Sequence, residues 1–162
     1  MSPEYISTET RFIADRMLGT LTRYLRFMGY DTISANGFGL GCSDEDTRLL
    51  ILARNERRIL LTRDHELARR GTDCTILVVP GDVLIQVQQL VDLGLIQRRL
   101  SLGRCSLCNT LLREATDNEA QSAHYAPHNR VDYKFFWCDT CKKLYWNGSH
   151  GKHLHKRLSS DT

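Results

Sequence analysis

Acidic residues end two of the apolar segments in this chain. Asp15 follows "RFIA" and Asp64 follows "RILLTR". The carboxyl ends of neighbouring parallel strands meet at one rim of a sheet, so these two carboxylates are expected to meet there if both segments are strands. The stretch "SDED" offers a third acid, one of Asp44, Glu45 and Asp46, at the expected start of a helix.

Three converging carboxylates predict a divalent cation, because like charges repel one another and are costly to remove from water. Hard oxygen ligands suit Mg²⁺ or Mn²⁺, which polarise a phosphodiester and activate water for in-line attack. The alternative is that Asp15 and Asp64 only cap the helices that follow them, which aspartate does well. Spacing alone leaves both interpretations open.

Two C-x-x-C pairs, Cys105 with Cys108 and Cys138 with Cys141, are separated by 29 residues. Two such turns predict a tetrahedral structural zinc site, which leaves no open position for chemistry. Disulfides and an iron–sulfur cluster are alternatives that fit the pattern less well. The segment between the pairs, "DNEAQSAHYAPHNR", is expected to form a loop between ribbon strands. Cys42 and Cys74 are expected to be small buried thiols.

Basic residues gather near the carboxyl terminus. Residues 142–157 hold five basic residues, three histidines and no acid, interleaved with Tyr145 and Trp146. This composition is typical of a surface that contacts phosphates, although a solvated tail has the same composition. The formal net charge of +3 comes entirely from the carboxy-terminal part of the chain, because acids and bases balance over residues 1–102.

Strand and helix patterns alternate along the first part of the chain. Strands are expected at 11–15, 30–35, 58–62 and 74–80, and helices at 16–28, 42–58, 65–70 and 82–94. This alternation predicts an α/β fold with a parallel sheet covered by helices on both faces. The pattern disappears after Leu95, which predicts a domain at 10–98, a zinc ribbon at 99–148 and a basic tail at 149–162.

The composition, with 41% hydrophobic and 25% charged residues, is that of a globular protein. The first residues, "MSPEYISTETRF", have neither the basic start nor the apolar stretch of a secretory signal, so a cytoplasmic location is expected. The aliphatic stretches are far shorter than the ~18 residues of a membrane span. We therefore expect no membrane contact.

Three motifs resemble, in order, the Mut-seven carboxy-terminal RNase family, a PIN-like domain fused to a zinc ribbon. They are "ADRMLGTLTRYLRFMGYDT", "RRILLTRDHEL", and "RCSLCN" with "CDTCKKLYWNGSH". The resemblance covers residues 11–155. It implies a PIN-like three-layer fold and a metal-dependent ribonuclease with clustered acids, a structural zinc and a catalytic Mg²⁺ or Mn²⁺.

The resemblance also implies roles for individual acids. Asp15 and Asp64 match the strand-end positions of the family, and Asp46 matches an aspartate seven positions before the helix alanine, Ala53. Asp44 and Glu45 are fallback candidates for the helix position. Glu66 is a weaker fourth member that would bind metal through water, and Asp82 competes with it for that role.

RNA is the expected partner, and association with ribosomes or RNA-processing proteins is a further expectation. Arg23 and Arg26 are expected on the exposed face of the first helix as part of a track for the RNA backbone. The expected RNA contacts are Arg16, Arg23, Arg26, Arg63, Lys142, Lys143, Tyr145, Trp146 and His150. The alternatives are a non-catalytic RNA-binding or RNA-processing accessory protein and a zinc-ribbon scaffold that joins proteins. The sequence leaves the oligomeric state open.

Overall fold

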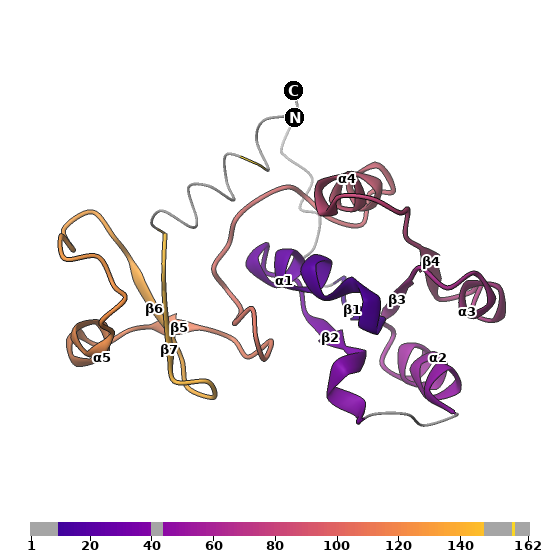
Figure 1. The fold of residues 1–162 in the computed structure, drawn as a ribbon, viewed down its shortest axis with the longest axis horizontal. Coiled ribbons are helices and arrows are strands. Elements are labelled where there is room, and N and C mark those ends of the chain that lie inside the picture. Colours follow the sequence, from indigo (N-terminus) through magenta and orange to yellow (C-terminus); the bar gives the residue numbers. More distant parts are fainter. Residues whose placement is uncertain (1–9, 40–43, 148–156, 158–162) are drawn as a thin grey trace.

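The first part of the chain folds around a four-stranded parallel sheet in the order β2-β1-β3-β4, as the computed structural model shows (Figure 1). The structure describes residues 10–39, 44–147 and 157. The strands are β1 (Phe12–Ala14), β2 (Thr32–Ser34), β3 (Ile59–Thr62) and β4 (Thr75–Leu77). The helices of this part are η1 (Arg16–Leu18), α1 (Gly19–Phe27), η2 (Ala35–Phe38), α2 (Glu45–Asn55), α3 (His65–Arg70) and α4 (Val83–Asp92).

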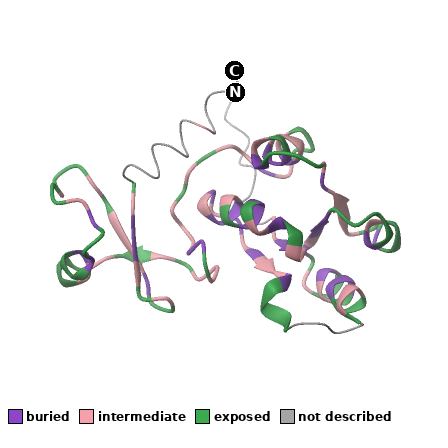
Figure 2. Cartoon of the chain, in the orientation of Figure 1, coloured by how far each residue is buried: buried purple, intermediate pink, exposed green. Residues whose placement is uncertain are grey.

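Helices cover both faces of the parallel sheet, which confirms the expected α/β three-layer fold. Phe12 and Ala14 pack with α1 and α4 on one face, whereas Ile13 and Leu60 pack with α2 and α3 on the other. Successive strand residues point to opposite faces, so strands buried on both faces must be apolar throughout. Buried residues accordingly lie on the sides of the helices that face the sheet (Figure 2).

The helix ends follow local sequence signals. Gly29, which follows the C-cap residue Met28 of α1, adopts φ of 91°, the left-handed conformation expected of a glycine at a helix C-terminus. Asp64 caps α3 and Asp82 caps α4, each by accepting a hydrogen bond from a backbone N–H of the first turn. These caps, which lie two residues beyond the end of β3 and five residues beyond the end of β4 respectively, fix where α3 and α4 begin.

The second part of the chain forms a three-stranded antiparallel sheet of β5 (Arg113–Glu114), β6 (Phe135–Cys138) and β7 (Lys143–Trp146). One prediction for this part is wrong, because residues 117–122 of the expected loop form a helix, α5 (Asp117–Ser122). A capping box between Thr116 and Glu119 stabilises its first turn. Ala120 of α5, with Ala123 and Ala126 after it, packs against Leu144 on one face of the small sheet.

The two parts contact each other through the loop that carries Cys105 and Cys108. The guanidinium of Arg26 donates to the carbonyls of Ser106 and Leu107 at 2.9 and 3.1 Å. In return, the amide oxygen of Asn109 accepts from the backbone N–H of Thr32 at 3.0 Å. Side chains from each part therefore bind the backbone of the other. Among the described residues, none of the helices is long and apolar enough to cross a membrane.

Candidate metal and RNA site

The carboxyl ends of β1 and β3 lie side by side and bring Asp15 close to Asp64. The strands pair in parallel with Ala14 opposite Leu61, and the backbone N–H of Asp15 donates to the carbonyl of Leu61 at 2.9 Å. The hydroxyl of Thr62 donates to Oδ2 of Asp15 at 2.7 Å and accepts from the backbone N–H of Asp64 at 3.0 Å. Thr62 is fully buried and connects both strand ends.

Asp64 also has the structural role that the sequence left open. Its Oδ1 accepts a hydrogen bond from the backbone N–H of Leu67 at 2.9 Å, so the residue caps α3. The side chain is exposed, and a carboxylate has further lone pairs for a second partner. Capping and cation binding are therefore compatible in this residue.

Asp46 reaches the same region from the first turn of α2. Its pKa is raised, first by burial and then by the charges of Asp64, Asp15 and Glu45, whereas Arg70 acts in the opposite direction. The carboxylate of Asp46 thus lies within electrostatic reach of Asp15 and Asp64. This electrostatic coupling is what a bound cation would relieve.

Two arginines flank the acids. Nε of Arg16 lies 2.7 Å from Oε1 of Glu45, and its guanidinium also donates to the carbonyl of Gly39. Nη1 of Arg70 lies 3.8 Å from Oδ2 of Asp46. Arg16 is held by two partners next to the aspartates, whereas the contact of Arg70 with the carboxylate is long.

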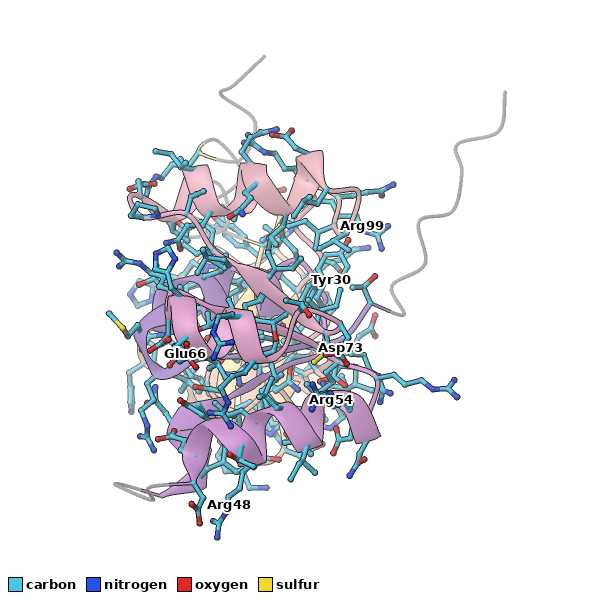
Figure 3. The ribbon with its side chains drawn as sticks, turned by 90° about the vertical axis from the view of Figure 1, so that its right-hand side faces the viewer. Tyr30, Arg48, Arg54, Glu66, Asp73 and Arg99 are labelled. Atoms are coloured by element: carbon cyan, nitrogen blue, oxygen red, sulfur yellow. The ribbon has the colours of Figure 1, made fainter. Side chains whose placement is uncertain are left out.

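Other candidate acids pair elsewhere. Glu66 binds Arg69 through both carboxylate oxygens at 2.6 and 2.8 Å, and the hydrogen bonds from Arg69 lower the pKa of Glu66. In Figure 3, Glu66 lies at one end of α3. The ion pair of Arg54 with Asp73 lies towards the other side of the same view. Asp82 caps α4 and lies 3.5 Å from Arg157. A metal role of Glu66 through water therefore stays a prediction.

The fit of these acids to a hard cation follows from their chemistry. Within the described ranges, they do not form a ligand set as closely gathered as the cysteines do. Mg²⁺ does not need one, since it usually keeps several waters and is held by one or two carboxylates. Asp15, Asp46 and Asp64 offer hard oxygen donors and unbalanced negative charge, which suit Mg²⁺ or Mn²⁺.

The four cysteines form a site for a metal such as zinc. Their sulfur atoms all lie within 4.8 Å of one another, and Cys108 and Cys138 are 3.5 Å apart. Sulfurs around one tetrahedral zinc would be about 3.8 Å apart, whereas a disulfide requires about 2.05 Å. Burial raises the pKa of Cys138, and the hydrogen bond with Cys108 raises the pKa of Cys141. Burial also opposes ionisation of Cys108, but its hydrogen bonds with Thr110 bring the pKa of this thiol down to about 6. A thiol with this pKa readily supplies the thiolate that a metal requires.

Two of the expected RNA contacts are buried. Arg26 is only 6% exposed and donates to backbone carbonyls, so the expectation that it lies on the exposed face of the first helix is wrong. Tyr145 is 7% exposed, and its hydroxyl lies 3.1 Å from the sulfur of Cys105. Both side chains therefore form their contacts within the protein and not at its surface.

The remaining expected contacts are more accessible. Arg23, Arg63 and Lys142 are exposed, and Lys143 lies with its ammonium 5.6 Å from the ring centre of Tyr145. Trp146 lies on the opposite face of the small sheet, where it stacks on Tyr125 at 5.9 Å between ring centres. His150 lies outside the described residues, as does Cys42. Cys74 is half-buried beside α2 and β3.

Comparison with known protein families gives a match over most of the chain. Residues 10–158 match the family described as the Mut7-C RNAse domain. No curated protein and no solved structure matches the chain.

Proposed function

Because the chain belongs to the Mut7-C RNAse domain family, we propose that it is a metal-dependent ribonuclease that hydrolyses RNA phosphodiester bonds. The observation that supports this most directly is the meeting of Asp15 and Asp64 at one rim, joined by the hydroxyl of Thr62. The raised pKa of Asp46 adds a third carboxylate within electrostatic reach.

The proposed mechanism assigns a separate task to each group. Asp15, Asp46 and Asp64 would hold Mg²⁺ or Mn²⁺, which would supply an activated water and stabilise negative charge on the phosphate. Thr62 orients the Asp15 carboxylate through its hydrogen bond. Arg16 keeps Glu45 engaged and so restrains the start of α2, on which Asp46 is carried.

The zinc ribbon is proposed to help bind RNA. Lys142 and Lys143 would contact phosphates, and Trp146 would stack on a base from the other face of the sheet. Arg23 and Arg63 would contact the RNA backbone near the acids. A zinc ion held by Cys105, Cys108, Cys138 and Cys141 would stabilise the ribbon without taking part in cleavage.

Asparagine substitutions test the acidic site without removing a helix cap. Asn caps helices about as well as Asp, so Asp64→Asn keeps the hydrogen bond to Leu67 but loses the charge. We expect Asp15→Asn and Asp64→Asn to slow cleavage of mixed cellular RNA in Mn²⁺ by about 100-fold or more, as loss of a metal ligand does.

Asp82→Asn is the matched control, because Asp82 also caps a helix that follows a parallel strand but pairs with Arg157 rather than with the aspartates. It should cleave at the wild-type rate. Wild-type cleavage by folded, zinc-loaded Asp15→Asn and Asp64→Asn would show that these carboxylates hold no catalytic ion. If the wild type itself retains RNA but does not cleave it, the chain is a binding protein.

A further inference from the structure

Helix α3 carries an acid at its start and a cation at its end that both act on the first turn of α2. Asp64 caps the helix, and its charge raises the pKa of Asp46. Arg70 is the last residue of α3, and its Nη2 donates to Oγ1 of Thr47 at 2.8 Å while Nη1 lies 3.8 Å from Oδ2 of Asp46. Arg70 therefore brings a positive charge to a carboxylate of the candidate metal site.

The contacts of Arg70 leave part of its guanidinium unused. The distance of 3.8 Å to Asp46 exceeds a hydrogen bond, and in the described part of the chain Nε of Arg70 has no hydrogen-bond partner. The neighbouring Arg69 differs, because both its contacts with Glu66 are short. Arg16 is likewise held by Glu45 and the carbonyl of Gly39. Arg70 is thus the most loosely held of these three cations.

We propose that Arg70 binds the phosphate at the cleaved bond and so positions the RNA against the acidic site, an inference that rests on the proposed function. A guanidinium presents its donors in a planar fork that matches two oxygens of a phosphate. The carboxylates at this rim repel a polyanion, so RNA needs a compensating cation beside them. A cation held by Asp46 would weaken the attraction of that carboxylate for Arg70 and so leave the guanidinium available for the phosphate.

If Arg70 binds the phosphate, its removal should lower the affinity for RNA and raise the affinity for Mn²⁺. Arg70→Ala should weaken RNA binding, because a phosphate contact is lost. The same variant should bind Mn²⁺ more tightly without RNA, since a positive charge is removed from beside Asp46. An arginine that merely pairs with Asp46 would also give the rise in Mn²⁺ affinity, but it would leave RNA affinity unchanged, so the RNA measurement decides between the two roles.

Arg69→Ala is the matched control, because it removes an equal charge from the adjacent position of the same helix. Mn²⁺ binding is measured by calorimetry on zinc-loaded protein, and binding and single-turnover cleavage are measured with a labelled single-stranded RNA. For Arg70→Ala we expect Mn²⁺ affinity to rise about two- to five-fold, RNA affinity to fall about 10-fold and cleavage to fall about 10- to 100-fold. Arg70→Lys should restore part of the RNA affinity, and Arg69→Ala should match the wild type.

The salt dependence of RNA binding gives an independent reading. Loss of one phosphate contact should reduce the slope of log affinity against log salt by about 0.7 for a single strand. Equal RNA affinity and slope in Arg70→Ala and Arg69→Ala would overturn the proposal. If the wild type neither binds Mn²⁺ nor cleaves RNA, the proposed nuclease function fails. The role of Arg70 is then decided by RNA affinity alone, where a difference between the two variants supports it and equality overturns it.

Discussion

Thr62 has a role at the candidate site that its sequence context does not reveal. In "ILLTRD" it resembles any β-branched residue of a buried strand, and only the pairing of β3 with β1 places its hydroxyl against Asp15. Asp15 and Asp64 could be predicted because the rule for strand ends is local. The partner of Thr62 lies 47 positions away in the sequence, so no local pattern could identify it.

Substitution of Thr62 by valine tests the contribution of its hydroxyl group while the volume of the side chain is kept. Thr62→Val keeps the volume but leaves Oδ2 of Asp15 without its donor and the N–H of Asp64 without its acceptor. Hydrogen bonds to charged groups contribute about 1.5–3 kcal/mol, so we expect cleavage to slow by about 10- to 100-fold.

Thr62→Ser is the control, because it restores the hydroxyl and should cleave within about three-fold of the wild type, a loss below 1 kcal/mol. Both rates are measured under single-turnover conditions in Mn²⁺. Equal rates for Thr62→Val and the wild type would exclude Thr62 from the positioning of Asp15.

Arg26 and Tyr145 were expected to contact RNA, but both side chains are buried and contact other parts of the protein. Arg26 follows Arg23 by three positions, as residues on one helix face do, yet its guanidinium binds a loop 80 positions further along the chain. Tyr145 and Trp146 are neighbours in sequence, but successive residues of a strand point to opposite faces. Both outcomes depend on which other element covers each face, which the sequence alone does not show.

The elements of the parallel sheet were predictable because their signals are strong. Continuous apolar strands, Gly29 after α1 and the capping aspartates all agree with the observed boundaries to within a few residues. Helix α5 was missed because its residues have no apolar periodicity. The signal that could have identified it is "TDNE", in which Thr116 and Glu119 form the capping box.

Asn109 connects the cysteine loop to strand β2. Its amide group accepts from the N–H of Thr32 and donates to Oδ1 of Asp31 at 2.7 Å, and its backbone adopts φ of 69°. Asn109→Gly keeps this left-handed conformation at no steric cost but removes both hydrogen bonds. We expect the free energy of unfolding to fall by about 2 kcal/mol, because two partners in the contact between the parts are left unsatisfied.

Arg57→Gly is the matched control for the change of backbone freedom. Arg57 is exposed and also has a left-handed backbone, with φ of 53°. Its replacement should change the free energy of unfolding by less than about 1 kcal/mol, as surface substitutions do. Denaturant unfolding of both variants measures the difference, and equal losses would show that Asn109 contributes only its backbone conformation.

At the scale of the whole molecule, the cysteine site and the four-stranded parallel sheet are expected to depend on each other. Arg26 is a buried cation whose pKa is lowered first by burial, and its partners include the carbonyls of Ser106 and Leu107 between Cys105 and Cys108. A buried charge that loses its partners is strongly destabilising. A disordered cysteine loop would therefore destabilise α1 as well as the ribbon.

This dependence can be tested by removing zinc and measuring hydrogen exchange at individual backbone amides. A chelator selective for zinc should release the loop and with it the Asn109 oxygen that accepts from the N–H of Thr32. Hydrogen exchange at Thr32 should accelerate by about 10-fold or more, since a lost bond of about 1.4 kcal/mol corresponds to a factor of ten. The N–H of Leu60, which bonds to the carbonyl of Cys74 within the same sheet, should change less. Unchanged exchange at Thr32 in zinc-free protein would show that β2, the edge strand of the parallel sheet, stays ordered without the zinc-bound loop. Zinc would then stabilise only the second part of the chain.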